Sequence, residues 1–268
     1  MNTLIVQSYR TRDVAPWINE CMASVRDWAS LRGYEYEFVD DRLFDYAPAW
    51  VRERCGAQKL PVTDVARLHL LRERLAQGWQ RVVWIDADVV VFAPQRFMLD
   101  DTAPYALCPE FWVRSTPSGR LEVIEKVNNA VTVITRDQPM LDFWIFAVEE
   151  ILRVHSTEQI GPLITGTIFY TDLAKIMPLR VVQDASLISP STVNDIANGG
   201  GRYLELWKRS VPGRVSAINL CASLQDQRYH NVCLSADDMQ RAVDVLRDGE
   251  GAILETNSMP GTVSYRIG

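Results

Sequence analysis

Residues 81–92 read RVVWIDADVVVF, an apolar and largely β-branched run that contains two carboxylates, Asp86 and Asp88. A continuous apolar run of this kind is typical of a strand that is buried on both faces, as in a parallel sheet. Charges inside such a strand are costly unless they are paired or bound to a ligand. We therefore predict that the strand ends at Asp86, so that both acids lie at its carboxyl edge, where open α/β sheets bind ligands.

The segments that precede this run alternate between strand and helix patterns. Residues 3–9 and 34–40 have strand patterns, whereas residues 13–33 and 60–78 have the spacing, the early Pro and the final Gly of helices. This order of strand, helix, strand, helix and strand predicts a parallel sheet with helices on both faces.

Beyond residue 92 the pattern is less regular. We expect further strands and helices, the strands at residues 104–112, 127–136 and 179–190 and the helices at residues 137–153, 161–175 and 235–249. From Ser191 onward the remaining residues suggest loops over one face. The predicted fold class is α/β, with a mainly parallel sheet flanked by helices and a smaller antiparallel, loop-rich C-terminal part. We expect a single domain over residues 1–268.

Composition narrows the class of protein. The chain has 268 residues and a net charge of −6, which argues against a nucleic-acid-binding protein, because such proteins carry a basic stripe. No apolar run is long enough to span a bilayer, and the first residues do not resemble a signal peptide. The five cysteines are scattered without CxxC spacing, as in a protein with reduced thiols. We expect a cytoplasmic protein, and peripheral contact with a membrane stays open.

Two carboxylates one residue apart at a strand end suit a hard divalent cation. Mg²⁺ and Mn²⁺ prefer oxygen ligands and commonly bind one or two protein carboxylates together with substrate phosphates. The cation then neutralises the charge that develops on a leaving phosphate. The alternative without function is a capped turn in which Asp86 and Asp88 accept hydrogen bonds from backbone amides.

The same stretch resembles a known group of enzymes. VVWIDADVVVF resembles the DxD strand of metal-dependent glycosyltransferases with the GT-A fold, which use nucleotide sugars. The longer segment TDVARLHLLRERLAQGWQRVVWIDAD is similar to the order Ser/Thr-Asp-x-x-Arg, apolar helix, Gly, short strand and DxD. That order marks the retaining families known for a sugar-binding region containing a DXD motif.

This resemblance implies roles for five residues. Asp64 and Arg67 would contact the sugar and phosphate of the donor, and their i,i+3 spacing places them on one helix face. The alternative for this pair is an ordinary surface ion pair. Asp88 would ligate the metal directly, and Asp86 would contact the ribose, or the metal through water. Ala87 would lie against the donor.

Two other segments resemble the family in the expected order. LIVQSYR resembles the opening strand, whose end helps to hold the nucleoside, and this nominates Gln7 and Tyr9. VNNAVTVITRDQPML is similar to a later strand, and would place Asn128 and Asn129 beside the donor sugar. Adjacent residues of a strand point to opposite faces, so at most one of these two can line a given pocket.

The last two matches are weaker. IGPLITGTIF resembles a Gly-Pro helix start that would place Gly161, Pro162 and Thr165 near the sugar or the acceptor, although Gly-Pro is also ordinary capping chemistry. The family usually adds a C-terminal metal ligand, often His. Here SAINLCASLQ puts Asn219 at that place, and an amide oxygen can ligate hard cations; His230 is the competing candidate.

The resemblance implies transfer of a sugar from a nucleoside-diphosphate sugar to a hydroxyl of a glycan, a lipid-linked sugar or a small molecule. It also implies Mn²⁺ or Mg²⁺ as cofactor, retention of the anomeric configuration and a role in polysaccharide biosynthesis. Within the single domain, it implies a nucleotide-binding half (1–100) and an acceptor-side half (101–268). The amide of Asn128 or Asn129 would position the sugar, and the sequence offers no evident nucleophile. Candidates for stacking on an acceptor sugar are two tryptophans in apparent loops, Trp112 and Trp207.

Two alternative functions remain. DADVV also fits the DxDx(T/V) motif of haloacid dehalogenase-type phosphatases, in which Asp86 would be the nucleophile and Asp88 the general acid. That family carries its motif on the first strand, whereas two predicted strands precede it here. The second alternative is a relative that binds nucleotide sugars without catalysis, because the usual His ligand is missing.

Overall fold

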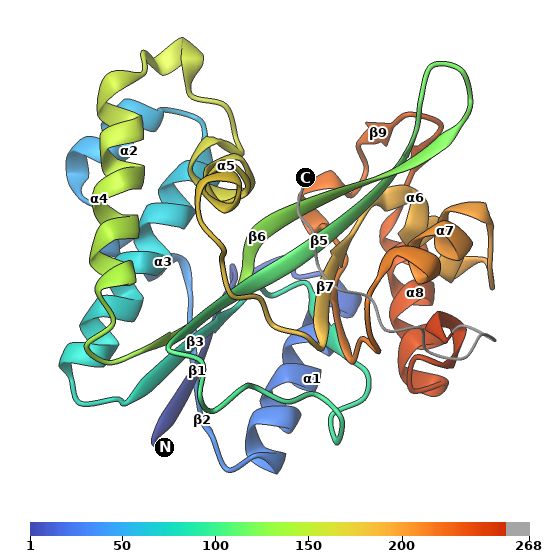
Figure 1. The fold of residues 1–268 in the computed structure, drawn as a ribbon, viewed down its shortest axis with the longest axis horizontal. Helices are drawn as coiled ribbons and strands as arrows, with labels where there is room; N and C mark the ends of the chain where they lie inside the picture. The colour runs from blue at the N-terminus through green and yellow to red at the C-terminus, as the bar shows by residue number, and fades with distance from the viewer. Residues whose placement is uncertain (256–268) are drawn as a thin grey trace.

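The computed structural model describes residues 1–255, in which eight strands form one sheet through the centre of the molecule (Figure 1). Across the sheet the strands lie in this order: β2 (Glu35–Val39), β1 (Thr3–Ser8), β3 (Arg81–Ile85), β6 (Leu121–Thr135), β5 (Tyr105–Ser115), β7 (Ala185–Ile188), β8 (Ala217–Asn219) and β4 (Val89–Val91). β1 pairs in parallel with β2 and β3, and β7 pairs in parallel with β5 and β8. The β3–β6, β5–β6 and β4–β8 pairs are antiparallel.

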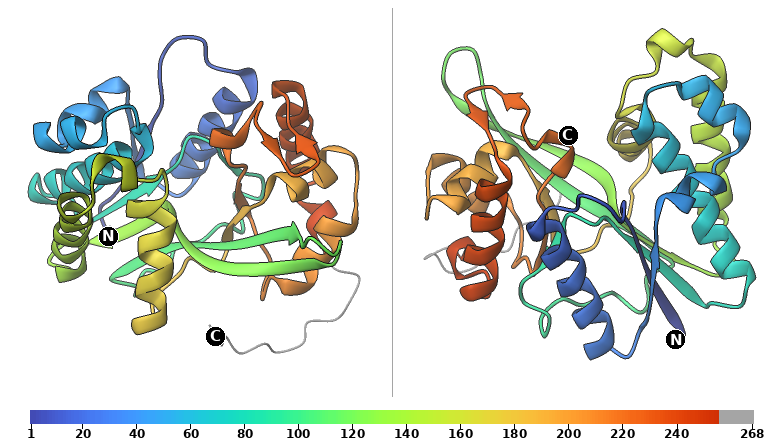
Figure 2. Two further views of the ribbon diagram at one scale, coloured as in Figure 1. Left: turned by 90° about the horizontal axis from the view of Figure 1, so that it is seen from above. Right: turned by 180° about the vertical axis from the view of Figure 1, so that it is seen from behind.

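Helices cover both faces of this sheet (Figure 2). They are α1 (Pro16–Leu31), α2 (Ala49–Cys55), α3 (Lys59–Ala76), α4 (Pro139–Val154), α5 (Phe169–Ile176), α6 (Pro190–Ala197), α7 (Arg202–Ser210) and α8 (Ala236–Asp248). A separate antiparallel pair is formed by β9 (Arg228–Tyr229) and β10 (Val232–Cys233). The predicted α/β fold class is confirmed. Among the described residues, no helix combines the length and the apolar composition that crossing a bilayer requires.

The apolar run that ends at Asp86 is buried on both faces, as predicted. Val82 and Trp84 of β3 pack in a core with α3 and α4, whereas Val83 and Ile85 pack in a second core with α1. Consecutive side chains of a strand point to opposite faces, so two covered faces require an apolar residue at every position. A third core lies among α6, α7, α8 and the beginning of α1.

The apolar residues after the acid pair do not continue β3. The strand ends at Ile85, the chain turns at Ala87–Asp88, and Val89–Val91 form β4 at the far end of the sheet order. There β4 pairs with β8, and its valines are buried. The prediction that the strand ends at Asp86 is therefore confirmed.

Two predicted segments differ from the structure. The helix predicted over residues 161–175 begins only with α5 at Phe169, and is preceded by a π-helical turn, Ile164–Ile168, whose backbone is non-helical at Gly166. The loops predicted after Ser191 are wrong, because α6, α7 and β8 occupy much of that segment. The apolar residues of α7 recur three and four positions apart, as in an amphipathic helix, at Tyr203, Leu204, Leu206 and Trp207. They fill the third core, in which Leu204 and Trp207 are almost fully buried.

Candidate functional site

The acid pair is held in place by the neighbouring strands. The backbone N–H of Asp86 donates to the carbonyl of Ala130 on β6 (2.8 Å). The backbone carbonyl of Asp86 accepts from the side-chain amide of Gln7 on β1 (3.1 Å), and the Tyr36 hydroxyl on β2 donates to the other end of Gln7 (3.1 Å). Gln7 is fully buried, so in this structure it supports the turn that carries the acids.

One carboxylate oxygen of Asp86 faces a polar and a cationic partner. Its Oδ1 accepts from Trp84 Nε1 (2.6 Å) and lies 3.2 Å from Nη1 of Arg67. Arg67 also stacks over the Trp84 ring, with 4.9 Å between the guanidinium carbon and the ring centroid. Oδ2 of Asp86 has no hydrogen bond to any residue in 1–255, and the side chain is a quarter exposed. One carboxylate oxygen is therefore available to a ligand.

Asp88 accepts hydrogen bonds from two donors, one at the end of β8 and one in the segment that follows it. Asn219 Nδ2 donates to Oδ1 (2.7 Å), and the backbone N–H of Ala222 donates to Oδ2 (2.7 Å). Burial, and next the nearby Asp86 carboxylate, raise the pKa of Asp88 to about 7. Two carboxylates that repel each other in this way are stabilised in their charged forms by a cation. The bond from the Ala222 amide is also of the kind that the capped-turn alternative expects, in which the acids accept from backbone N–H groups.

Asn219 is oriented by its neighbours. Its Oδ1 accepts from the backbone N–H of Cys221 (2.8 Å), so Nδ2 must face Asp88. The side chain is buried, and in this geometry it positions the acid. His230 is exposed in the turn between β9 and β10, where its ring lies edge-on to Tyr229 at 4.5 Å. Either role as a metal ligand stays a prediction.

A second group of predicted residues meets around Asp64. Asn129 Nδ2 donates to Oδ1 of Asp64, and Thr165 Oγ1 donates to Oδ2, both at 2.9 Å. Arg67 lies 3.4 Å from Asp64 and donates to the backbone carbonyl of Asn129 (2.9 Å). Burial raises the pKa of Asp64, against the opposing effect of Arg67. A Cβ at Gly166 would lie 2.9 Å from Asp64 Oδ2, so the π-helical turn approaches this carboxylate as closely as only glycine allows.

Asn128 has partners different from those of Asn129, beside a register shift in the pairing of β5 with β6. Its Oδ1 accepts from the backbone N–H of Ala130 (2.8 Å), and its Nδ2 donates to Thr167 (2.7 Å) and to Glu110 on β5 (3.1 Å). Glu110 is only 3% exposed and also accepts from Lys126 (2.8 Å). Asn128 thus contacts Thr167 directly, whereas Asn129 is connected to Thr165 through the Asp64 carboxylate.

Three residues of this region were not identified from the sequence: Trp84, Glu110 and Lys126. Glu110 belongs to the same electrostatic neighbourhood as the acid pair, because the Asp88, Glu110 and Asp86 charges all add to the effect of burial that raises the pKa of the Cys221 thiol to about 12. The sequence signal for Glu110 was that of a single Glu within the strand predicted over residues 104–112, directly after Pro109.

The remaining predicted residues lie around this group. Tyr9 is half-buried against the third core, and burial raises its pKa. Ala87 is buried in the same core. Gly161 and the exposed Pro162 precede the π-helical turn, and the structure assigns them no contact with Asp64 or Asp86.

The carboxylates of the acid pair fit a metal ion whose remaining ligands come from a substrate. Within residues 1–255, no group of three or more His, Cys, Asp or Glu side chains could hold a metal ion by itself. Asp86 and Asp88 supply two carboxylates, which is the number that Mg²⁺ sites with substrate phosphates commonly use. The acid pair therefore suits a cation that binds together with a phosphate-bearing ligand.

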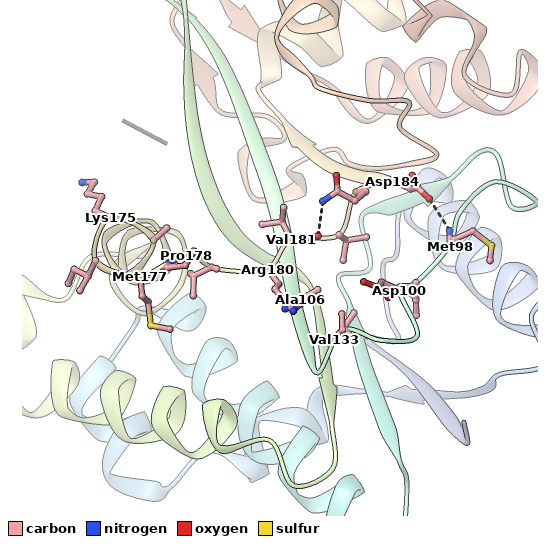
Figure 3. Close-up of a pocket in the computed structure, with 17 residues that line it drawn as sticks. Met98, Asp100, Ala106, Val133, Lys175, Met177, Pro178, Arg180, Val181 and Asp184 are labelled. Carbon is pink, nitrogen blue, oxygen red and sulfur yellow. Dashed lines mark hydrogen bonds between the residues drawn. The ribbon is translucent and has the colours of Figure 1, made fainter. Parts of the chain in front are cut away.

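A separate hollow of about 810 Å³ lies away from these residues (Figure 3). Its floor includes Ala106 of β5 and Val133 of β6, and its walls come from residues 98–103 and 174–184. None of the predicted site residues lines it.

Comparisons with known proteins give only distant likenesses. No protein-family model matches the chain, and no curated protein matches it. Among solved structures, a glycosyltransferase involved in glycosylation of the major capsid of PBCV-1 is 12% identical, with a TM-score of 0.45, covering 90% of this chain and 98% of that one. Mouse xyloside xylosyltransferase 1 in its apo form is 11% identical, with a TM-score of 0.42, covering 83% of this chain and 98% of that one. A197 from STIV is 13% identical, with a TM-score of 0.27, covering 65% and 78%. Solved structures similar to this chain thus include glycosyltransferases, but at these scores the likeness assigns no function.

Proposed function

We propose that this protein transfers a sugar from a nucleoside-diphosphate sugar to an acceptor hydroxyl, with Mn²⁺ or Mg²⁺ bound at Asp86 and Asp88. The observation that carries the proposal is the pair of carboxylates at the carboxyl end of β3. They stand beside Arg67, and one oxygen of Asp86 is unbonded within the described chain. Asp64, Asn129 and Thr165, nominated by the same resemblance, meet next to this pair.

The side chains divide the work of holding the donor. Asp88, oriented by Asn219 and the Ala222 amide, would ligate the cation, and Asp86 would do so through its unbonded oxygen or through water. When bound, the cation supplies charge neutralisation for the departing diphosphate. Arg67 is fixed by Asp64 and the Asn129 carbonyl, so its guanidinium is held beside the acids without further ordering.

The finer features of the proposal rest on the resemblance of the sequence. These are retention of the anomeric configuration, the nucleoside contacts of Gln7 and Tyr9, and the completion of the metal site by Asn219 or His230. The phosphatase alternative gains no support, because the acid pair follows the third strand along the chain and not the first.

The test is thermal unfolding with a panel of nucleoside diphosphates and nucleotide sugars, each with and without Mn²⁺. A ligand that binds the native state at about 100 times its Kd stabilises it by about 2.7 kcal/mol, which raises Tm by about 5 °C in a chain of this size. We expect one nucleoside diphosphate to raise Tm only in the presence of the metal. Asp88→Ala should abolish this shift, whereas Asp172→Ala, which removes an exposed acid of α5, should retain it. The absence of any shift in the wild-type protein would overturn the proposal.

A further inference from the structure

Buried Glu110 and partly buried Lys126 form an ion pair that the proposed roles above do not use. They are cross-strand partners on β5 and β6, and Lys126 Nζ lies 2.8 Å from Glu110 Oε1. The Glu110 side chain is 3% exposed and that of Lys126 is 25% exposed. Lys126 also lies over the Trp112 ring, 5.0 Å from its centroid.

A buried charge at this position is unfavourable for stability by itself. Removing two charges from water costs several kcal/mol per ion before their attraction offsets it, and apolar replacements of such pairs are often neutral or stabilising. Four residues along the same ribbon, the cross-strand pair Arg114–Glu122 makes the same kind of contact (2.7 Å) on the same face in exposed positions. The sheet therefore accommodates an ion pair there without burying it.

The second oxygen of Glu110 connects the pair to the candidate site. Glu110 Oε2 accepts from Asn128 Nδ2 (3.1 Å), and the same nitrogen donates to Thr167 (2.7 Å). Because Ala130 N–H occupies Asn128 Oδ1, both protons of Nδ2 are directed at these two acceptors. Thr167 follows Gly166 and Thr165 in the turn that contacts Asp64.

We propose that Glu110 is a positioning residue of the sugar side of the site: held by Lys126, it fixes the Asn128 amide and, through Thr167, the Thr165–Thr167 turn against Asp64. This inference rests on the proposed function. It separates two parts of donor binding, since the acid pair at Asp86 and Asp88 receives the diphosphate and the Glu110-ordered turn receives the sugar.

The experiment replaces the pair in the full-length protein. Glu110→Leu combined with Lys126→Met leaves no unpaired charge, keeps an unbranched side chain over Trp112, and leaves Asn128 its bond to Thr167. The exposed pair is replaced in the same way as a matched control, by Arg114→Met with Glu122→Leu. For each protein we measure the Tm without ligand, with Mn²⁺ and the nucleoside diphosphate, and with Mn²⁺ and the nucleotide sugar.

We expect the Glu110/Lys126 double variant to fold with a stability close to that of the wild type, because removing the two charges offsets the loss of an acceptor for one Asn128 proton. It should keep the shift given by the nucleoside diphosphate. The additional shift given by the sugar should be lost, corresponding to about 10-fold or more weaker binding of the nucleotide sugar. The isosteric Glu110→Gln should lose the additional shift from the sugar as well, because the NH₂ group of Gln would face either Lys126 or Asn128, which are both donors. The control double variant should behave as the wild type.

Two results would overturn the inference. One is an unchanged additional shift from the sugar in the Glu110/Lys126 variant. The other is an equal loss of the diphosphate shift and the sugar shift, which would make Glu110 a general support of the fold. If the wild-type protein responds to no nucleoside diphosphate or nucleotide sugar, the proposed function itself fails, and the inference fails with it.

Discussion

Arg67 on α3 reaches Asp86 at the end of β3, with 3.2 Å between Nη1 and Oδ1, and so joins a helix to the end of the strand that follows it in the chain. The same guanidinium lies 3.4 Å from Asp64 and donates to the Asn129 carbonyl. The buried Arg67 guanidinium thus connects both halves of the candidate site.

The first prediction concerns Arg67. Arg67→Ala should lower the free energy of unfolding by about 3 kcal/mol, because it leaves the buried Asp64 carboxylate without its charged partner. Arg67→Lys should recover only part of this loss, since an ammonium group cannot reproduce the planar set of donors. Urea unfolding measures both. Arg72→Ala on the exposed face of the same helix is the control and should stay within about 0.5 kcal/mol of the wild type. Equal effects at positions 67 and 72 would contradict the geometry described here.

The second prediction concerns the close approach of the π-helical turn. Gly166→Ala places a Cβ 2.9 Å from Asp64 Oδ2, so the turn or the carboxylate must move. We expect the free energy of unfolding to fall by about 1–3 kcal/mol, as for other overpacked sites. Gly161→Ala, five residues earlier, meets no atom within 4 Å and should leave stability unchanged. A Gly166→Ala protein as stable as Gly161→Ala would show that the turn does not rest on Asp64.

The third prediction separates the two candidates for a further metal ligand. Asn219→Ala removes the Nδ2 donor of Asp88, and should weaken the Mn²⁺-dependent shift of Tm by the nucleoside diphosphate. His230→Ala alters an exposed ring at the β9–β10 turn and should leave that shift intact. Titration of each variant with Mn²⁺ at a fixed nucleotide concentration measures the difference. A loss confined to His230→Ala would mean that the β9–β10 turn moves onto the acids when the donor binds.

The fourth prediction concerns pH. Burial raises the pKa of Tyr36 from its ordinary value near 10 to about 12 in the folded protein. A raised pKa in the native state means that the neutral hydroxyl stabilises the fold fully below about pH 10, and that this contribution is lost as the pH rises toward about 12. Tyr36→Phe should therefore be less stable than the wild type by about 1 kcal/mol at pH 8, where the bond to Gln7 is lost.

The difference between Tyr36→Phe and the wild type should shrink between about pH 10 and about pH 12, because the phenol ionises in the unfolded wild type while burial keeps it neutral in the folded protein. Urea unfolding at a series of pH values measures it. A constant difference from pH 8 to 12 would mean that the pKa of Tyr36 is the same in the folded and unfolded states.

The sequence alone determined the features that depend on local periodicity. The end of β3 at Asp86 followed from charges that a doubly buried strand does not accept, and α3 with Asp64 and Arg67 on one face followed from helical spacing. That Asn128 and Asn129 serve opposite faces stays a prediction from their adjacency; the structure gives the two amides different partners, Glu110 and Thr167 for Asn128 and Asp64 for Asn129. Each of these features depends on backbone geometry over a few residues, so it can be predicted without knowing which distant segments pack nearby. The division of the chain into a nucleotide half and an acceptor half stays a prediction.

Only the tertiary structure decided what depends on contacts distant in the chain. Val89–Val91 look like a continuation of β3, but they pair with β8 at the other edge of the sheet. Asn219 reaches Asp88 across 131 positions, and Glu110 becomes part of the site because β5 and β6 align it with Lys126 and Asn128. α6 and α7 pack in the third core with α8 and the beginning of α1, which lie far from them in the chain. Strand order and register set these distances, and they are fixed by the packing of the whole chain, so no local pattern of residues contains them.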